Sequence, residues 1–345
     1  MTTQITALLR DKVITASDGA VTVDNIKAWK NVKKTFKLSD KPPINIMING
    51  SPTVNNFPVN LLIHEFEKIV KSDNIEDMSD EFLDFIGKTV PKNDAEKYIE
   101  NHIIHFKLIY GPVDDNNYDK FIEIKDIFNI KIPEFINTKY DSKFEEIIET
   151  DLPTYEKNEI LEILKKMFCH YLMLISTGVV ISGISSGDFF PSSISFNMIL
   201  NDNGKIQILN KKTNINCNNT KFDVYGQTDV IDSYLTGIDE DFEISLFKII
   251  KKIFNPSNEE FEILKRDIEK IKIKNKNNIL SRVDSLPDND LYEMLEILIK
   301  STELKRKLLS NIDSVSGDVH IEKITKNKGI ETEEKIYKRI RTIKD

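Results

Sequence analysis

The chain has 345 residues, of which 40% are hydrophobic and 30% charged, and its formal net charge is −8. A chain of this length buries a sizeable core, as one large domain or as two ordinary ones. The net acidic charge argues against the broad basic field that nucleic-acid binding needs, so no nucleic-acid partner is expected.

No apolar run reaches the roughly 20 residues of a membrane helix, so no membrane partner is expected either. The first residues lack the basic and apolar regions of a secretory signal. The two cysteines, Cys169 and Cys217, fit a reducing compartment and exclude a disulfide scaffold. Together these observations predict a cytoplasmic protein.

The first 50 residues are rich in β-forming residues. Residues 3–23 follow a strand pattern that is broken only at Arg10 to Lys12, which predicts an antiparallel hairpin with a tight turn. Two more strands are expected at 32–38 and 44–50, the second ending at Gly50. Four strands thus precede any helix.

Helical periodicity begins at Phe57 and continues, with polar interruptions, to Ser176. The stretch 131–143 is its least regular part. The last helix, 159–176, is apolar on more than one face and is therefore expected to be buried. Cys169 lies in this helix, which predicts a buried and inert thiol.

Two histidines of the helical segment, His102 and His105, are three residues apart and can share a helix face. No carboxylate on that face completes a metal-binding set, because Glu100 points to another side of the helix. Local packing or hydrogen bonding is the favoured interpretation, so neither a metal nor a cofactor is expected.

Strands return after the helical segment, followed by helices and a last strand. The strands are expected at 178–185, 193–200, 205–209 and 318–326. The helices are expected at 228–238, 241–254, 257–272 and 290–310. Ser257 and Glu260 form a capping-box pattern at the start of the third of these helices.

The order of elements fixes the expected fold class. Hairpins in both strand blocks, without βαβ alternation, predict an α+β structure of antiparallel sheets covered by helices. The chain is expected to form one domain, 1–345, with 57–176 as an enlarged helical segment and 330–345 as a C-terminal tail helix.

Thr2 is a candidate nucleophile. Removal of Met1 would leave one residue with both a hydroxyl and a free α-amine, whose reference pKa of about 7.7 to 8 allows it to act as a base near neutral pH. The alternative is that Met-Thr is simply a common start of cytosolic proteins.

Asp18 lies 16 residues after Thr2, and Lys34 lies 32 after it. With Gly50 at the end of the fourth strand, this pattern resembles the amino-terminal half of proteasome β-type subunits, including the bacterial HslV type, which are N-terminal nucleophile hydrolases. Asp313 and Ser316 take the places of that family's Asp-x-x-Ser-Gly segment. The middle block, 178–204, looks like the family's glycine-containing strand, proline, strand and glycine-bearing turn.

The resemblance implies a four-layer αββα sandwich of two antiparallel sheets and a threonine-type peptidase or amidohydrolase. Lys34, paired with Asp18, would favour the alkoxide of Thr2 and keep its amine neutral. The Gly50 N–H would bind the oxyanion. Asp313 and Ser316 would orient the amine and hydroxyl of Thr2. The substrate would be a peptide or another amide, and a homo-oligomer is expected from ring-forming relatives.

Two departures from the family leave alternatives open. Gly226, Gln227 and Thr228 stand where the family has a Gly-Ser-Gly-like element, so no serine is present there, and Gln227 or Thr228 would have to substitute as a hydrogen-bond partner. The helical segment 57–176 is also far longer than the family's two helices. Taken singly, each site residue has an ordinary structural interpretation. A non-catalytic relative that serves as an assembly or binding module is therefore the main alternative, and acyl transfer through Thr2 is a further one.

Overall fold

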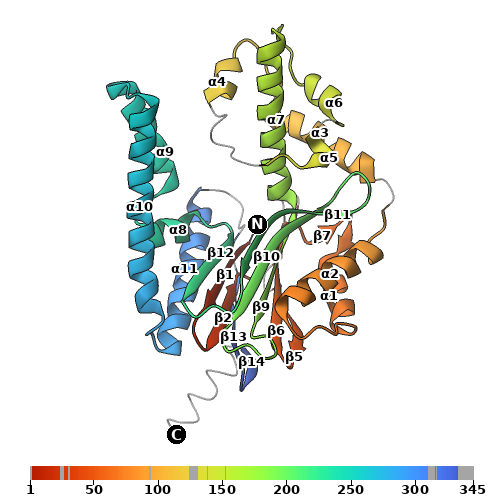
Figure 1. The fold of residues 1–345 in the computed structure, drawn as a ribbon, viewed down its shortest axis with the longest axis vertical. Coiled ribbons are helices and arrows are strands. Elements are labelled where there is room, and N and C mark those ends of the chain that lie inside the picture. Colours follow the sequence, from red (N-terminus) through yellow and green to blue (C-terminus); the bar gives the residue numbers. More distant parts are fainter. Residues whose placement is uncertain are drawn as a thin grey trace.

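The computed structural model describes residues 2–23, 27–29, 32–92, 95–123, 131–137, 139–151, 153–309, 315 and 317–332. These residues form a mixed α+β structure with two five-stranded antiparallel sheets and eleven helices (Figure 1). The predicted α+β class and antiparallel sheets are therefore confirmed. Among the helices of these ranges, none is both long and apolar enough to cross a membrane.

The first sheet has the strand order β12-β1-β2-β13-β14, with antiparallel neighbours throughout. Its strands are β1 (Thr3–Leu8), β2 (Lys12–Ser17), β12 (Lys221–Gly226), β13 (His320–Thr325) and β14 (Gly329–Thr332). The predicted N-terminal hairpin is formed by β1 and β2, and the Leu9 N–H closes its turn by donating to the Lys12 carbonyl (2.9 Å). Because β1 lies between β2 and β12, the backbone that follows Thr2 is held from both sides.

The second sheet has the order β11-β10-β9-β6-β5 and is also antiparallel. Its strands are β5 (Thr35–Asp40), β6 (Pro43–Gly50), β9 (Thr177–Gly183), β10 (Ser192–Leu200) and β11 (Ile206–Asn214). Two short ribbons pair β3 (Val21–Val23) with β4 (Lys27–Trp29), and β7 (Thr53–Val54) with β8 (Phe57–Pro58). The predicted strand ending at Gly50 is β6.

Seven helices occupy most of the predicted helical segment 57–176. They are α1 (Val59–Glu67), α2 (Ile75–Thr89), α3 (Ala95–Tyr110), α4 (Tyr118–Glu123), α5 (Glu134–Asn137), α6 (Asp141–Glu145) and α7 (Thr154–Ile175). The stretch predicted to be least regular, 131–143, contributes only to the short helices α5 and α6. α7 is buried on more than one face, as its sequence predicted, and shares a hydrophobic core with α3, α4, α5 and α6.

Four helices follow β12 and precede β13: α8 (Asp229–Thr236), α9 (Glu240–Phe254), α10 (Asn258–Val283) and α11 (Asp288–Leu309). The capping box predicted at Ser257 and Glu260 is confirmed at the start of α10, with each residue satisfying a backbone N–H of the other. α10 continues well past the predicted end at residue 272.

Helices cover the outer faces of the two sheets: α8, α11 and the end of α10 share a core with the first, and α1 and α2 share one with the second (Figure 1). Phe66 of α1 and Phe82 of α2 share a core with Phe196 of β10. Leu295 of α11 shares another with Ile5 of β1. Full burial of such side chains stabilises the fold by about 1.5–3 kcal/mol each.

The inner faces of the sheets carry polar side chains. Asn45 of β6 donates to Thr15 Oγ1 of β2 and to Glu322 Oε2 of β13, both at 3.1 Å, and accepts from Ser182 Oγ of β9 at 2.7 Å. All four residues are buried. Ile5 of β1 faces the helices, and side chains alternate along a strand, so the neighbouring Gln4 lies on the inner side. The sheets therefore meet through a hydrogen-bonded layer.

The short strands β4, β7 and β8 were not expected from the sequence, and two strands of the first sheet also differ from the prediction. β12 was not expected, because its polar sequence follows an Asn- and Lys-rich turn, and its pairing with β1 makes it a strand. The tail helix predicted for 330–345 is wrong at its start, where β14 pairs with β13 through residues such as Ile330 and Ile324. The rest of that predicted helix lies outside the described residues.

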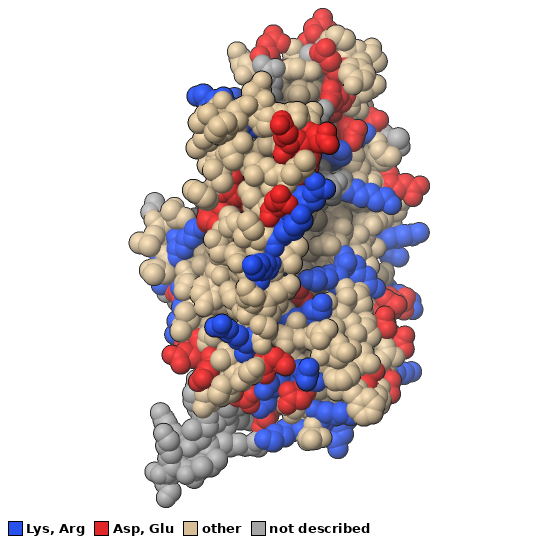
Figure 2. All heavy atoms as spheres, turned by 60° about the vertical axis from the view of Figure 1, so that its left-hand side comes forward, with Lys and Arg blue, Asp and Glu red and all other residues tan. Residues whose placement is uncertain are grey.

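Charged side chains of both signs lie on the surface. On the face drawn in Figure 2, Lys and Arg occur among Asp and Glu, with uncharged residues between them. Exposed helix pairs such as Lys265 with Glu262 (2.8 Å) are examples of this mixing. Pairs of this kind contribute little to stability because water screens them.

Candidate active site

Thr2, Lys34 and Asp18 meet at the end of the first sheet. The Lys34 Nζ lies 2.9 Å from Thr2 Oγ1 and 2.9 Å from Asp18 Oδ1. All three are buried, with 6%, 3% and 1% of their surfaces exposed, respectively. A single lysine thus joins a hydroxyl to a carboxylate away from bulk water, where the local field acts with little screening.

The Asp18 carboxylate is fixed by the backbone around it. Asp18 follows β2, and its Oδ1 accepts from the Thr3 N–H (2.9 Å) while its Oδ2 accepts from the Ala20 N–H (3.1 Å). The Asp18 N–H in turn donates to the Thr3 carbonyl (3.2 Å). With the bond from Lys34, these contacts hold both carboxylate oxygens in one orientation.

Lys34 lies just before β5, and its carbonyl accepts from the Ile48 N–H of β6 (3.0 Å). Burial lowers the pKa of Lys34 below its ordinary value, and the Asp18 carboxylate opposes that shift. Because the net shift of the Lys34 pKa is downward, the cost of burying the ammonium outweighs its attraction to Asp18. Lys34 is therefore a cation closer to releasing its proton than a lysine in water.

The main chain of Thr2 is bound from the loop after β12. The Gln227 N–H donates to the Thr2 carbonyl (2.8 Å), and Thr3 Oγ1 donates to the Gln227 carbonyl (3.3 Å). Gly226 has φ +80°, and a Cβ on it would lie 2.0 Å from the Thr2 carbonyl oxygen, so only glycine fits. Backbone groups of Gln227 thus bind the main chain of Thr2 and the hydroxyl of Thr3.

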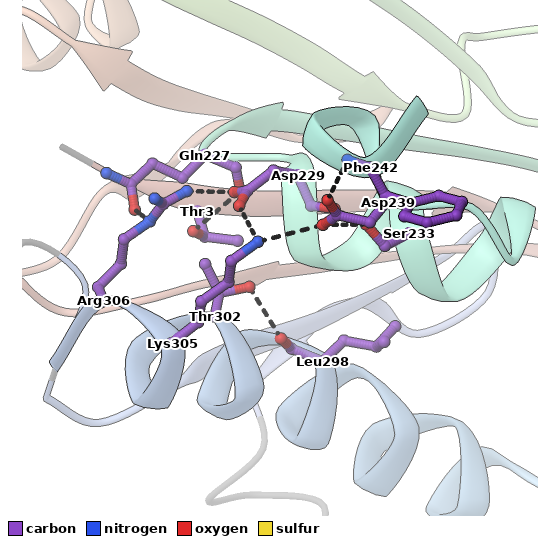
Figure 3. A network of polar contacts seen from close by, with 10 residues as sticks. All are labelled: Thr3, Gln227, Asp229, Ser233, Asp239, Phe242, Leu298, Thr302, Lys305 and Arg306. Atoms are coloured by element: carbon purple, nitrogen blue, oxygen red, sulfur yellow. Dashed lines mark hydrogen bonds and ion pairs between the residues drawn. The ribbon is translucent and has the colours of Figure 1, made fainter. Parts of the chain in front are cut away.

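The side chain of Gln227 is itself anchored from α11 (Figure 3). Arg306 Nε donates to Gln227 Oε1 (2.6 Å), and the Arg306 guanidinium also pairs with Asp229. Lys305 pairs with Asp229 (2.9 Å) and with Asp239 (3.4 Å). The loop that binds Thr2 is therefore tied to three helices.

Gly50 ends β6 in the left-handed region, with φ +70°. A Cβ at this position would lie 2.3 Å from the Ser176 carbonyl oxygen, so the close approach of β6 and the start of β9 requires glycine. The end of β6 is tied to β1, because Gln4 Nε2 donates to the Ile48 carbonyl (2.7 Å) and Asn49 Nδ2 donates to Gln4 Oε1 (3.2 Å). These bonds fix Gly50 relative to the strand that follows Thr2.

Two clefts meet at Thr2, Asn49 and Gly50, which line both of them. The first, called here the Phe36 cleft, has a volume of about 260 Å³ and a largely apolar wall. Its apolar residues are Val32, Phe36, Ile48, Pro52 and Pro58. The second, the Asn197 cleft, has a volume of about 360 Å³. Its polar residues include Ser176, Ser195, Asn197, Asn210, Gln227 and Thr228.

The structure brings together four of the six site residues expected from the sequence. Thr2, Asp18 and Lys34 are in direct contact through Lys34, and Gly50 lies beside Thr2 on the walls of both clefts. Asp313 and Ser316 lie outside the described residues.

Two contributing residues, Gln4 and Arg306, were not expected from the sequence. Gln227 was expected only as an alternative to Thr228 as a hydrogen-bond partner, and its backbone N–H binds the Thr2 carbonyl. Gln4 carried a usable signal, since strand alternation places it on the same face as Thr2. Arg306 carried none, because its partners are distant along the chain.

The histidines and the buried cysteine behave as expected. His102 Nδ1 and His105 Nδ1 both lie within hydrogen-bond distance of the Tyr171 hydroxyl, at 3.1 and 2.9 Å. Burial, with the neighbouring His105, lowers the pKa of His102 to about 4. Burial raises the pKa of the Cys169 thiol to about 12. The described part of the chain contains no group of three or more His, Cys, Asp or Glu residues placed to hold a metal ion.

Comparison of the chain with protein-family models found no match, and comparison with curated proteins found none either.

Proposed function

We propose that this chain is an N-terminal threonine amidohydrolase that resembles proteasome β-type subunits, with Thr2 as the nucleophile once Met1 has been removed. The observation that carries the proposal is the buried Lys34 ammonium held 2.9 Å from both Thr2 Oγ1 and Asp18 Oδ1. A cation fixed beside a hydroxyl stabilises the alkoxide that must form when the hydroxyl attacks.

In the proposed reaction the Thr2 α-amine takes the proton from Oγ1 as Oγ1 attacks the substrate carbonyl. The Gly50 N–H donates to the oxyanion of the tetrahedral intermediate. Collapse of the intermediate breaks the C–N bond, and the leaving amine takes the proton from the Thr2 ammonium. The product is an ester on Thr2 Oγ1, which water then hydrolyses to release the acid and restore the hydroxyl.

The arrangement of helices supports the finer fold assignment. Helices α8 and α11 pack on the outer face of the first sheet, and α1 and α2 pack on that of the second. We therefore propose a four-layer αββα sandwich of the N-terminal nucleophile hydrolase type. Helices α3 to α7 form a separate hydrophobic core, which fits the proposal that they enlarge the family's helical region.

The Phe36 cleft indicates what the acyl side of the substrate contains. Its wall is mostly apolar and begins at Lys34, whose Nζ contacts the hydroxyl of Thr2. An apolar side chain on the acyl group would lose water there without stranding a polar group. The proposed substrate is therefore a peptide or amide with an apolar side chain next to the cleaved bond.

The test combines the amino-terminal mass with covalent labelling. Intact-mass measurement of the purified protein should show that Met1 is absent. A β-lactone or epoxyketone probe should then add one equivalent to the wild type and none to Thr2→Ala, while Thr2→Ser, which keeps a hydroxyl, should retain some labelling. Retention of Met1, or equal labelling of Thr2→Ala, would rule out the mechanism and favour a non-catalytic assembly or binding module.

A further inference from the structure

We propose that the Asn197 cleft binds the amine side of the substrate, which is the leaving group or an acyl acceptor, and that it selects an uncharged, hydrogen-bonding group. The inference rests on the proposed threonine chemistry and adds a second subsite to it. It also gives the enlarged helical segment a role, because Met173 and Leu174 of α7 form part of this cleft.

The position of Thr2 assigns the two clefts to opposite sides of the reacting bond. Its hydroxyl points to Lys34, which lines the Phe36 cleft, whereas its carbonyl is bound by Gln227, which lines the Asn197 cleft. The α-amine of Thr2 must give its proton to the leaving amine, so the leaving group has to lie beside Thr2. With the acyl side proposed for the Phe36 cleft, the Asn197 cleft, which Thr2 also lines, is left for the leaving group.

The charge of the lining residues separates this cleft from its neighbour. Lys33 and Lys34 line the Phe36 cleft, but no described residue that lines the Asn197 cleft is charged. Asn197 and Asn210 stand opposite each other on β10 and β11, and Asn197 Nδ2 donates to Ser176 Oγ (2.9 Å). Carboxamides and hydroxyls can both donate and accept hydrogen bonds, which suits a neutral polar partner.

A charged group would be disfavoured in this cleft. Moving an ion out of water is costly unless a counter-charge or several hydrogen bonds replace its hydration shell. A carboxamide has nearly the same shape but no charge, and the carboxamides of the facing Asn197 and Asn210 offer both donors and acceptors to it. The cleft should therefore discriminate between glutamine and glutamate, which differ little in shape.

The experiment follows the fate of one acyl-enzyme. An activated ester of a capped leucine acylates Thr2, and an added amine then competes with water. The amine nitrogen forms a bond to the acyl carbon, the bond from that carbon to Thr2 Oγ1 breaks, and Oγ1 regains a proton. The acceptors are the α-amides of glutamine, glutamate and lysine, and the measured quantity is the ratio of transfer product to hydrolysis product.

The wild type should use the glutamine amide about tenfold better than the glutamate amide at equal concentration of free amine, a difference of about 1.4 kcal/mol. Asn197→Asp adds one negative charge and should therefore make the lysine amide a better acceptor than the glutamate amide. Asn60→Asp is the matched control, because Asn60 lines the Phe36 cleft and is exposed, so its acceptor ratios should stay as in the wild type.

The outcomes separate the two proposals. If no acyl-enzyme forms at Thr2, the proposed function fails, and this inference fails with it. If the acyl-enzyme forms but glutamine and glutamate amides are used equally, only the second subsite is refuted. An equal shift of the ratios by Asn60→Asp and Asn197→Asp would place the acceptor outside the Asn197 cleft and refute it as well.

Discussion

Replacement of Lys34 by methionine tests the centre of the proposed site, because methionine keeps the length of the side chain and removes its charge. At 2.9 Å from Asp18, and with an effective dielectric constant near 20, the lost attraction is about 6 kcal/mol. Burial lowers the pKa of Lys34 despite this attraction, so the desolvation of the ammonium is of comparable size. The stability lost in Lys34→Met is therefore smaller than the Coulomb attraction between Lys34 and Asp18.

The net loss comes from Asp18, which is 1% exposed and would keep a negative charge with no cation beside it. Removal of one partner of a buried pair destabilises by about 3–5 kcal/mol. Lys34→Met should lower the free energy of unfolding by about that amount, as measured by urea denaturation. The double variant with Asp18→Asn should regain part of the loss, because no buried charge is then left unpaired.

Acylation of Thr2 should slow by about 10²–10³-fold in Lys34→Met, since the alkoxide loses its only contacting cation among the described residues. Time-resolved intact mass with an activated ester measures this rate on folded protein, whose state is checked by circular dichroism. A folded variant that acylates within about threefold of the wild type would refute the role of Lys34. A stability loss below about 1 kcal/mol would refute the buried ion pair.

Gly50→Ala should reduce stability by about 1–3 kcal/mol and slow acylation, because alanine is strained at φ +70° and its Cβ would lie 2.3 Å from a carbonyl oxygen. Gly111→Ala is the control for backbone strain alone, because Gly111 has φ +73° but open space around it. Equal losses of stability in the two variants would contradict a clash between the Cβ at position 50 and the Ser176 carbonyl oxygen. Arg306→Lys should lower kcat about tenfold with little change in KM, since lysine keeps a charge near Asp229 but loses the second donor that fixes Gln227. A KM effect alone in steady-state amide hydrolysis would argue against positioning. Folding lowers the pKa of Lys34 below its ordinary value of 10.5. Between the folded-state pKa and 10.5, Lys34 is protonated in the unfolded chain but not in the folded one. The free energy of unfolding therefore rises with pH across this window. Urea denaturation from about pH 8 to 10.5 should show this rise in the wild type relative to Lys34→Met, and parallel curves would contradict it.

The local elements were predictable because their signals are local. Alternation of β-forming residues predicted the β1–β2 hairpin, and the Ser257–Glu260 capping box predicted the start of α10. The expectation that Asp18 and Lys34 lie near Thr2 came from the resemblance to proteasome β-type subunits, and the structure places both of them there. No contact across the chain was needed for any of these predictions.

The tertiary structure decided what depends on contacts between distant segments. β12 is a strand because β1 pairs with it across more than 200 residues of sequence, and the loop after it supplies the Gln227 N–H that binds Thr2. Arg306 reaches that loop only because α11 packs against the first sheet. The sequence alone determined which residues could carry the chemistry. The fold set the distances between them and the burial that lowers the pKa of Lys34, because desolvation is a property of the whole fold.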